Sequence, residues 1–342
     1  MRLRIVHHTH YRYAPSVVMA QHLAHLRPLV LPDQVVTAHH VTIEPEPAHV
    51  SQSEDAFGNQ RCFFSLQSPH EALSVLSDCE VETSAPQLLP ESPPWEDVRD
   101  DLTYRAGAPY DPASEFTFAS PFAPRSPVLA DFARPVFEPG EPLLDCAQAL
   151  MSRIHTEMTY EGGSTGVNTP TLAALAQRKG VCQDFAHIMI GCLRSLGLPT
   201  RYVSGYLLTH PPEGQPRMIG ADASHAWVQV YCPVGVDSTE QTGGVWVDFD
   251  PTNNRSGWGR PGEDYVTLAV GRDFGDVSPL RGVIQGGSSH QLTVAVTVAP
   301  PEELVEADLF CSRTATPSTR PARLKPAQPN VFGSKQSNTD RR

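Results

Sequence analysis

The pattern of apolar and polar residues divides the chain into a strand-rich first part and a mixed second part. Over residues 1–85, β-branched and aromatic residues alternate partly with polar ones, as in LRIVHHTHYRYA (3–14) and HHVTIEPE (39–46). This two-residue period is typical of half-buried strands. A third run, DAFGNQRCFFSL (55–66), contains the Gly58–Asn59 pair of a tight turn leading into a strand. We therefore expect a β-rich N-terminal domain.

Helical spacing first appears in LLDCAQALMSRIHTEM (143–158), where apolar residues recur at steps of three and four. A second helix is predicted within NTPTLAALAQRKG (168–180). Thr169 has the residue type of an N-cap, Pro170 suits the first helical position, and Gly180 follows the last turn. These signals place two helices directly before the central part of the chain.

A third helix is predicted from Cys182 to about Gly197, where glycine and a nearby proline stop it. Three strand-like runs follow, RYVSGYLL (201–208), SHAWVQVYC (224–232) and GVWVDF (244–249). They are rich in β-branched and aromatic residues and short enough for strands. Helices followed by strands predict an α+β core.

Proline and polar composition mark two further segments. Residues 86–142 hold twelve prolines, a density that favours an extended connector over regular structure. From Ser312 to the end there are seven Lys or Arg, one Asp and few apolar residues, which predicts disorder. The expected division is a β-rich domain (1–110), a Pro-rich connector (111–142), a core with a C-terminal strand extension (143–299) and a disordered tail (300–342).

Charge and composition exclude several classes of protein. The formal net charge is −12 at pH 7, so the chain lacks the basic surface that nucleic acid binding requires. No run of about 18 apolar residues could span a membrane, and MRLRIVHHTHYRY lacks the apolar centre of a signal peptide. We expect a cytoplasmic protein that binds neither nucleic acid nor membrane. Seven cysteines without a CxxC pair favour reduced thiols over a zinc or redox site.

Cys182 has the most unusual position among these cysteines. In the first turn of a helix, free backbone N–H groups and the positive end of the helix dipole favour a thiolate and can bond an oxyanion. The alternative is a cysteine that packs under the first turn. A nucleophile needs a base, and at about 100° per residue His187 and Asp184 point roughly 140° and 200° away. The partner must therefore come from another element, and His187 is expected to be a hydrogen-bonded polar residue of the helix.

The strand that begins at His225 supplies such a base. Alternation places Ala226, Val228 and Val230 on the opposite face from His225, ready to cover a core. Trp227 shares the face of His225, where it either walls a site or serves as an ordinary core residue. An imidazole at the start of a strand is thus available to a thiol from the helix.

A third group must orient the imidazole. The segment VWVDFDPT supplies Asp248 and Asp250, which strand alternation places on one face, so periodicity does not choose between them. Asp250 directly precedes Pro251, whose rigid turn would fix the carboxylate. The pattern therefore leaves two candidate acids.

Three motifs in this order, RKGVCQDFAHIMIGCLRSLGLPTRYVSGYL, SHAWVQVY and WVDFDPTNN, resemble the transglutaminase-like superfamily of papain-like cysteine enzymes. The resemblance assigns the catalytic residues to Cys182, His225 and Asp250. HHTHYRY, DAFGNQ and SPHEALSV resemble the bacterial transglutaminase-like N-terminal domain, so the likeness spans about residues 1–299. It implies an α+β fold in which a catalytic helix packs on an antiparallel sheet, preceded by a β-rich, sandwich-like domain.

The resemblance also implies a reaction. Cys182 would attack an amide carbon of a peptide or protein substrate, His225 would protonate the leaving amine, and Asp250 would hold the imidazole. Water would complete a protease or amidase reaction and an amine would complete cross-linking, with hydrolysis implied at least as much as transfer. The Cys182 N–H is one expected oxyanion donor. The second is left unassigned, with Gln177, an indole or a phenol as candidates. No cofactor or metal is expected.

Two alternatives from other classes stay open. The first is a binding or scaffold protein that keeps the fold without chemistry. The second is a metal module built on the N-terminal histidines, since His8 and His10 share a strand face. His39 and His40 do not share one, and no cysteine or carboxylate accompanies these residues at ligand spacing.

Two further features receive structural predictions. Cys192 and Cys232 are expected to be core thiols, on an apolar helix face and on a strand. The polar, Gly- and Pro-rich stretch THPPEGQPRMIGADA (209–223) directly precedes His225. It is expected to be either a lid at the substrate rim or a solvated connection between strands.

Overall fold

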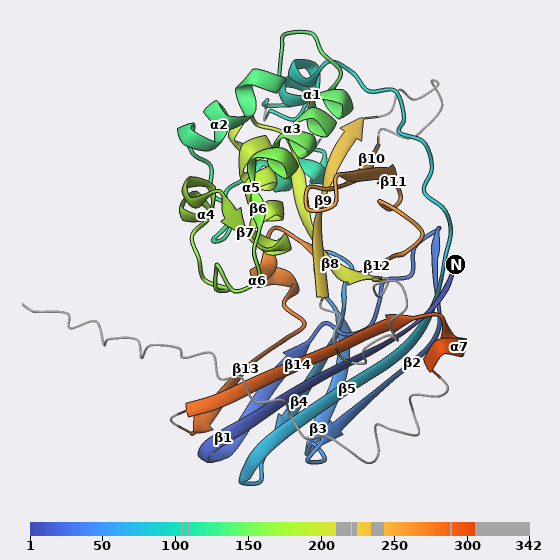
Figure 1. The fold of residues 1–342 in the computed structure, drawn as a ribbon, viewed down its shortest axis with the longest axis vertical. Helices are drawn as coiled ribbons and strands as arrows, with labels where there is room; N and C mark the ends of the chain where they lie inside the picture. The colour runs from blue at the N-terminus through green and yellow to red at the C-terminus, as the bar shows by residue number, and fades with distance from the viewer. Residues whose placement is uncertain are drawn as a thin grey trace, which may run out of the picture.

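The computed structural model describes residues 1–103, 105–107, 110–209, 220, 224–233, 243–287 and 289–304. In the upper part of Figure 1, helices lie on one side of a sheet, and long strands form a second sheet in the lower part. The prediction of an α+β fold with a β-rich N-terminal region is confirmed. Among the described residues, no helix is long and apolar enough to cross a bilayer.

The lower sheet has seven strands and is built on the long strand β1. Its path is β2-β5-β1-β4-β3, and β13 and β14 add to β1 in antiparallel register. The bounds are β1 (Arg2–Ala24), β2 (Gln34–Glu44), β3 (His49–Glu54), β4 (Gln60–Leu66), β5 (His70–Thr83), β13 (Leu280–Gly286) and β14 (Ser289–Ala299). The strand extension that the sequence attached to the core therefore lies in the N-terminal sheet.

The turn before β4 follows the expected chemistry. Gly58 adopts the left-handed conformation, with a φ of 85° that glycine enters without steric cost. The Asp55 carboxylate accepts the amides of Phe57 and Asn59, each at 2.9 Å. This Asx-type turn confirms the prediction made from the Gly58–Asn59 pair.

The upper sheet runs in the order β11-β10-β9-β8-β12 with antiparallel neighbours. Its bounds are β8 (Thr200–Leu207), β9 (Ser224–Pro233), β10 (Gly244–Asp250), β11 (Arg255–Trp258) and β12 (Tyr265–Gly271). Helices α3 (Leu143–Glu157), α4 (Thr171–Gln177) and α5 (Cys182–Ser195) belong to the same part of the chain. The predicted helices and strands of the core are thus present.

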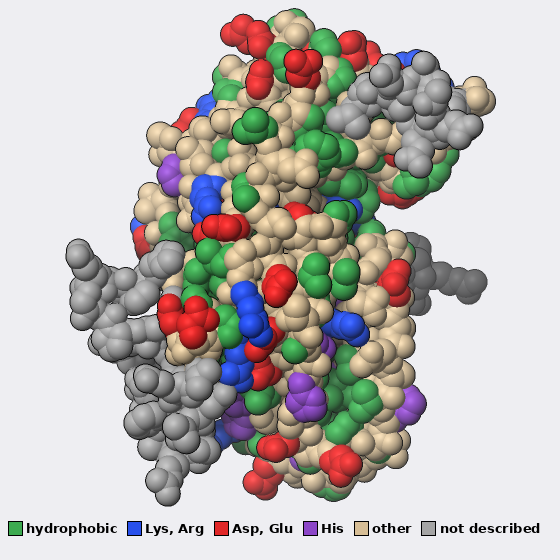
Figure 2. All heavy atoms as spheres, turned by 90° about the vertical axis from the view of Figure 1, so that its right-hand side faces the viewer, with side chains coloured by type: hydrophobic (Ala, Val, Ile, Leu, Met, Phe, Trp, Pro, Cys, Tyr) green, Lys and Arg blue, Asp and Glu red, His purple; other side chains and the backbone are tan. Residues whose placement is uncertain are grey.

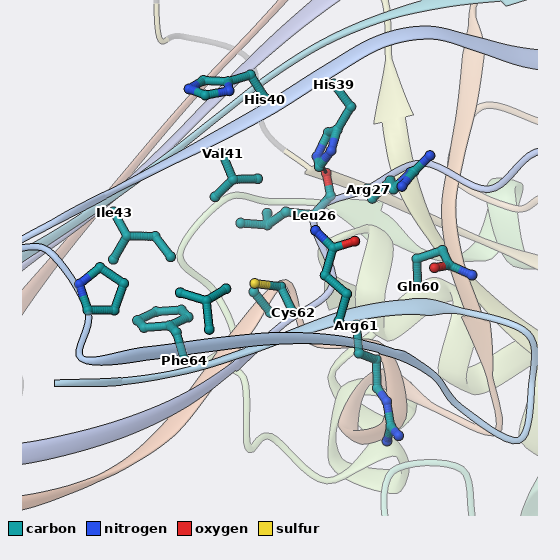
Figure 3. Close-up of a pocket in the computed structure, with 14 residues that line it drawn as sticks. Leu26, Arg27, His39, His40, Val41, Ile43, Gln60, Arg61, Cys62 and Phe64 are labelled. Atoms are coloured by element: carbon teal, nitrogen blue, oxygen red, sulfur yellow. Dashed lines mark hydrogen bonds between the residues drawn. The ribbon is translucent and has the colours of Figure 1, made fainter.

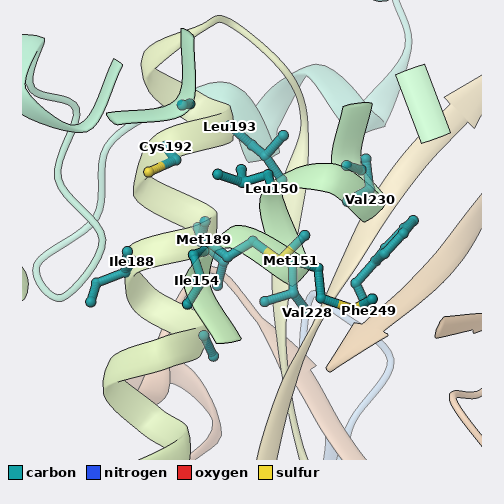
Figure 4. Packing of buried hydrophobic residues seen from close by; sticks show 14 of the residues in the cluster. Leu150, Met151, Ile154, Ile188, Met189, Cys192, Leu193, Val228, Val230 and Phe249 are labelled. Atoms are coloured by element: carbon teal, nitrogen blue, oxygen red, sulfur yellow. The ribbon is translucent and has the colours of Figure 1, made fainter. Parts of the chain in front are cut away.

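Helix α5 is central to this core, so nearly all of its sides are buried. Ile188, Met189 and Leu193 pack with α3 side chains and with residues of the sheet (Figure 4). Val228 and Val230 belong to this cluster, on the α5 face of β9 that strand alternation predicted. Burial of this apolar surface holds the start of α5 against the sheet.

The two sheets share buried contacts, both apolar and polar. β1 and β5 share one hydrophobic cluster with residues of β8, β12 and β14. β12 ends the upper sheet, and its backbone is paired by two fully buried side-chain amides, Gln34 and Asn59. Gln34 contacts the N–H and C=O of Thr267, and Asn59 those of Val270, at 2.7–2.8 Å. These amides satisfy the strand edge as another strand would.

The Pro-rich segment differs from the expectation of an extended connector. It contains α1 (Trp95–Asp101), η1 (Pro112–Thr117), α2 (Pro127–Ala133) and η2 (Arg134–Val136). Pro94 is the N-cap of α1, and Pro112 and Pro127 occupy first helical positions. A proline at such a position loses no intrahelical bond, and its φ suits a helix. The prolines that were expected to prevent regular structure therefore start short helices.

Helix α4 begins one residue later than the sequence predicted. Pro170, not Thr169, is the N-cap, and the chain leaves the helix through Arg178 in the left-handed conformation. The Thr169 hydroxyl instead accepts the Gly166 amide at 2.9 Å. The φ of −61° at Pro170 suits either position, and its extended ψ of 137° makes it the N-cap.

The remaining short elements are β6 (Thr159–Tyr160), β7 (Lys179–Gly180), α6 (Phe274–Val277) and α7 (Pro301–Leu304). The predicted tail includes α7, and its residues from 305 onward lie outside the described part of the chain. Of the predicted lid at 209–223, only Thr209 and Gly220 are described. The first residues of the predicted disordered tail are therefore helical, and the lid and the disorder from residue 305 onward stay predictions.

Candidate active site

Helix α5 begins at Cys182, with Val181 as its N-cap in extended conformation. Cys182 is partly exposed, in the first turn as predicted. The Asp184 carboxylate accepts the Val181 amide at 2.8 Å and the Thr165 hydroxyl at 2.6 Å. Asp184 therefore fixes the start of the helix and its preceding loop, a role that agrees with its exclusion as a partner of Cys182.

His187 is buried in the core, five residues along the same helix. Its ring stacks on Phe122 with centroids 5.5 Å apart, and Nε2 accepts the Phe274 amide at 3.2 Å. Burial lowers the pKa of His187 to about 3, so the imidazole is neutral. The prediction of a hydrogen-bonded structural histidine is confirmed.

His225, at the start of β9, contacts both of its predicted partners. Its Nε2 lies 2.7 Å from the Asp250 Oδ2, and Cys182 lies close enough to the ring to raise the pKa of the imidazole. Because Nε2 faces the carboxylate, Nδ1 is the nitrogen left for the thiol. The structure thus brings together residues from α5, β9 and β10 that are 43 and 25 positions apart in the sequence.

The charges of His225 and Asp250 stabilise each other. Burial lowers the pKa of His225, but hydrogen bonds with Asp250 and Cys182 and the negative charge on both outweigh it and raise the pKa to about 10. Burial raises the pKa of the Asp250 carboxyl, yet the bond and charge of His225 hold it below its ordinary value. An imidazolium between a carboxylate and a sulfur is therefore favoured at neutral pH.

Asp250 is held by several donors besides His225. The Tyr265 hydroxyl donates to it at 2.6 Å, the Asn253 side chain at 2.7 Å and the Thr252 amide at 2.8 Å. Asn253 and Thr252 belong to the turn that follows β10, whereas Tyr265 comes from β12. Sequence reasoning found none of the three. Asn253 is visible in the DPTNN motif, but no local pattern links Tyr265 to this site.

Asp248 lies on the same face of β10 but does not contact the imidazole. Its Oδ1 accepts the Trp227 indole N–H at 2.7 Å and the Gln229 side-chain amide at 2.9 Å. Burial raises the pKa of Asp248 to about 7, since these bonds and the Arg201 charge offset only part of it. Contacts therefore separate the two aspartates that alternation left equivalent.

Trp227 fulfils both roles that the sequence left open. It is fully buried, and its ring stacks against His225 with centroids 6.0 Å apart. The Tyr265 ring packs edge-on against both, at 5.4 Å from Trp227 and 5.8 Å from His225. The two aromatic rings restrict the orientations open to the imidazole.

The rim beside Cys182 is formed by β6 and β7. Tyr160 pairs in register with Gly180, two residues before Cys182, and its side chain is 57% exposed. Partial burial and then the charge of Cys182 raise the pKa of the Tyr160 phenol, which shows that the two groups are close. Gln177, one of the candidates for the second oxyanion donor, is exposed at the end of α4. Tyr160 was not singled out from the sequence.

Two other thiols have the predicted structural character. Cys192 and Cys232 are fully buried, and burial raises the pKa of both, that of Cys232 to about 11. Such thiols stay protonated at neutral pH.

The N-terminal histidines bond to protein groups instead of gathering into a metal site. His8 contacts the Ser74 hydroxyl at 2.8 Å, and His39 contacts the Leu26 carbonyl at 3.2 Å. Within the described ranges, no cluster of three or more His, Cys, Asp or Glu has the arrangement of a metal site. The described residues give the metal-module alternative no support.

The surface charge is mixed. On the face seen in Figure 2, acidic and basic side chains are interspersed, and the described atoms there form no broad basic patch. This distribution, with a net charge of −12, gives no support to nucleic acid binding.

Comparison with known proteins agrees with this architecture. Residues 3–82 match the family model for the bacterial transglutaminase-like N-terminal region, and residues 130–251 match the transglutaminase-like superfamily. An uncharacterized protein of Mycobacterium tuberculosis is 40% identical over 305 residues, covering 87% of this chain and 93% of that protein. One from Mycobacterium leprae is 33% identical over 301 residues, covering 87% and 98%.

A solved structure shares the fold. The crystal structure described as "a Putative Cysteine Protease from Cytophaga hutchinsonii" superposes with a TM-score of 0.65 and 20% identity, covering 88% of this chain and 91% of that one. At this identity the likeness shows the fold alone. Together with the sequence matches, it establishes that the chain belongs to the transglutaminase-like superfamily, a family of cysteine-dependent enzymes.

Proposed function

We propose that this protein is a cysteine-dependent enzyme that cleaves or transfers amide bonds of peptides or proteins, with hydrolysis as its principal reaction. The observation that carries the proposal is the position of the His225 imidazole, which lies 2.7 Å from the Asp250 carboxylate and close enough to Cys182 for that thiol to raise its pKa.

Each residue has a role that follows from its position. The Cys182 thiolate attacks the amide carbon and forms a tetrahedral intermediate, which collapses to a thioester as the C–N bond breaks. His225 gives its proton to the leaving amine, and Asp250 keeps the ring oriented. Water, deprotonated by His225, then attacks the thioester, and the acid product leaves as the thiol is restored. An amine in place of water would give a new amide bond.

The oxyanion of the intermediate needs donors near the sulfur. The Cys182 backbone N–H lies in the first turn of α5, where it has no intrahelical acceptor. The Tyr160 phenol, on the neighbouring β6, is our candidate for a second donor in place of Gln177. It would also form one wall of the substrate site.

Mass spectrometry of the products tests the proposal and separates its variants. The enzyme is incubated with glutamine-containing and ordinary peptides, with and without a primary amine. Hydrolysis gives cleaved or deamidated peptides whether or not amine is present, and transfer gives amine adducts. Cys182→Ala should abolish every product, while Cys62→Ala, at the other partly exposed cysteine among the described residues, should retain them. Product formation by Cys182→Ala would refute the assignment, and no product from the wild type would favour a scaffold.

A further inference from the structure

We propose that the upper sheet carries a second binding site, separate from the catalytic residues, for a ligand with a carboxylate attached to an aromatic group. The site is a cavity of about 400 Å³ that Arg201 of β8, Tyr231 of β9 and Trp246 of β10 help to line. This volume lies in the range of roughly 300–1,000 Å³ typical of small-molecule sites. Six residues of β9 separate Tyr231 from His225, or about 20 Å of strand.

The three lining side chains lie on the same face of the sheet. Strand alternation puts Tyr231 on the face of Trp227, and it puts Trp246 on the face of Asp248. The Arg201 guanidinium lies over the Trp246 ring, 4.2 Å from its centroid, and the Tyr231 and Trp246 rings are 5.3 Å apart. Helix α5 packs on the opposite face. Arg201 therefore points to the side of the sheet on which the cavity lies.

Aromatic rings form the walls of the cavity. Phe116 of η1 packs edge-on against Trp246, with centroids 5.2 Å apart. Phe57, from the turn before β4, contacts Phe116 at 5.7 Å. Both phenylalanines line the cavity together with Tyr231 and Trp246. Such walls favour a planar ring, which can stack on one wall and meet another edge-on.

The Arg201 guanidinium is held in place by the protein itself. Its Nε donates to the Gln229 side-chain oxygen at 2.7 Å, and the Gln229 amide donates in turn to Asp248 at 2.9 Å. The Trp246 ring supports the plane of the guanidinium. A guanidinium fixed in this way loses little conformational entropy when it binds an anion.

This guanidinium has no carboxylate partner among the described residues. Its one hydrogen bond there is the bond to Gln229, which leaves both Nη atoms without an acceptor in the described part of the chain. Burial lowers the pKa of Arg201 to about 10, so the side chain keeps its charge at neutral pH. A bound carboxylate would accept two parallel N–H bonds from the guanidinium and balance its charge.

Asp111 also lines the cavity, but its oxygens already have donors. Its Oδ2 accepts the Tyr231 hydroxyl at 2.6 Å, and its Oδ1 accepts the Ala113 amide at 2.8 Å. These bonds hold the start of η1, and with it Phe116, against β9. Asp111 thus shapes the wall, and Arg201 is the charged group available to a ligand.

A cavity in the lower sheet offers a contrast. It has a volume of about 340 Å³ and lies between β2 and β4 (Figure 3). Val41, Ile43 and Phe64 lie together there and belong to or pack against the core of that sheet. Apolar surface of this kind does not discriminate between charged and neutral ligands. The cavity therefore provides a control for non-specific binding of an aromatic ring.

Isothermal titration calorimetry with the full chain tests the site. The probes are 3-phenylpropionate, its neutral amide 3-phenylpropanamide, and hexanoate, which has the charge without the ring. We expect 3-phenylpropionate to bind with one-to-one stoichiometry and at least about tenfold more tightly than the amide, since charge-assisted bonds contribute on that order. Hexanoate should bind more weakly than 3-phenylpropionate because it cannot stack on the walls.

A peptide separates the two sources of such a ligand. Acetyl-Ala-Ala-Phe carries the same carboxylate and ring at the end of a chain, and it is titrated into Cys182→Ala so that it is not cleaved. Tighter binding than 3-phenylpropionate assigns the site to peptide C-termini, and weaker binding assigns it to small free acids.

Two variants locate the binding. Arg201→Gln should weaken 3-phenylpropionate binding by at least about tenfold and leave amide binding unchanged. Trp246→Leu should weaken both by about threefold or more, since it removes an aromatic wall. Thermal unfolding by circular dichroism establishes that each variant is folded.

Matched controls lie outside the cavity. Arg153 also stacks on an aromatic ring, but it is paired with Glu157. Trp95, like Trp246, is partly buried. Arg153→Gln and Trp95→Leu should both bind 3-phenylpropionate like the wild type. Val41→Phe, which fills the cavity of the lower sheet, should do the same.

Four results would overturn the inference. They are equal affinity for 3-phenylpropionate and its amide, unchanged 3-phenylpropionate binding in folded Arg201→Gln and Trp246→Leu, loss of binding in folded Val41→Phe, and no binding by the wild type up to the solubility limit. Because the titrations measure binding and not turnover, they stand independently of the proposed enzyme activity.

Discussion

Asp250 and Asp248 lie two residues apart on one face of β10, and both are fully buried. The pKa values of the two carboxyls are shifted in opposite directions. The pKa of Asp250 is held below its ordinary value, and that of Asp248 is raised by burial to about 7. Burial alone therefore does not decide the charge of an acid in this core.

The difference comes from the groups that each carboxyl meets. Asp250 accepts bonds on both oxygens, from the His225 ring, Tyr265, and the Thr252–Asn253 turn. Asp248 accepts two bonds on Oδ1, and its Oδ2 has no partner among the described residues. Donors that bond the charged form stabilise it against desolvation, so the donor-rich end of β10 is where a carboxylate can orient an imidazolium.

The largest expected effect contrasts the two acids directly. Asp250→Asn should lower kcat/KM by roughly 10³–10⁴-fold, because an amide favours the wrong imidazole tautomer. Asp248→Asn should lower it by less than about tenfold, since Asp248 does not touch His225 and Asn keeps an oxygen for Trp227. Steady-state kinetics on a cleavable peptide measures both, with circular dichroism as the folding control. Equal losses at the two positions would leave the orienting acid unassigned.

A smaller effect is expected at Tyr265. Tyr265→Phe keeps the ring against His225 and Trp227 but removes one of the bonds to Asp250. We expect kcat/KM to fall by about tenfold, the value of one hydrogen bond to a charged group. Tyr231→Phe removes a hydroxyl that bonds Asp111 elsewhere and should change kcat/KM little. Similar losses in both variants would mean that the Asp250 contact has no special effect.

The third prediction concerns stability instead of activity. Between its ordinary pKa of 3.8 and the raised value of about 7, Asp248 holds a proton in the folded state that the unfolded state has released. The wild type should therefore lose stability relative to Asp248→Asn as pH rises through this window, by at least about 1 kcal/mol. Urea unfolding of both proteins at about pH 5 and pH 8 measures this. A stability difference that is the same at both pH values would show that Asp248 is ionised throughout.

Local patterns in the sequence predicted much of this site. Glycine shortly before Cys182 indicated a helix start. Alternation put His225 and Trp227 on one face of their strand, and it put Asp248 and Asp250 on one face of theirs. Alternation could not choose between Asp248 and Asp250, because that choice depends on Tyr265, which reaches the site from a strand 15 residues further on. The family motif, not the periodicity, pointed to Asp250.

Long-range pairing explains the other differences from expectation. Nothing in the sequence of β13 or β14 indicates that they pair with β1, almost the whole chain away. Likewise, the role of Asn59 follows from its pairing with Val270, which no turn signal reveals. In the Pro-rich segment, the density of prolines predicted an extended connector. Prolines at helix starts instead favour the helices that they would break elsewhere.

The proposed chemistry depends most on the pairing of Cys182 with His225, and the rate of Cys182 alkylation as a function of pH tests this pairing most directly. Peptide mapping after brief exposure to iodoacetamide gives the rate for each cysteine in the wild type and in His225→Ala. We predict that Cys182 reacts first in the wild type and that His225→Ala slows it by at least about tenfold near pH 6, where the imidazolium sustains the thiolate. Coincident pH profiles for the two proteins, or faster labelling of another cysteine, would contradict the account.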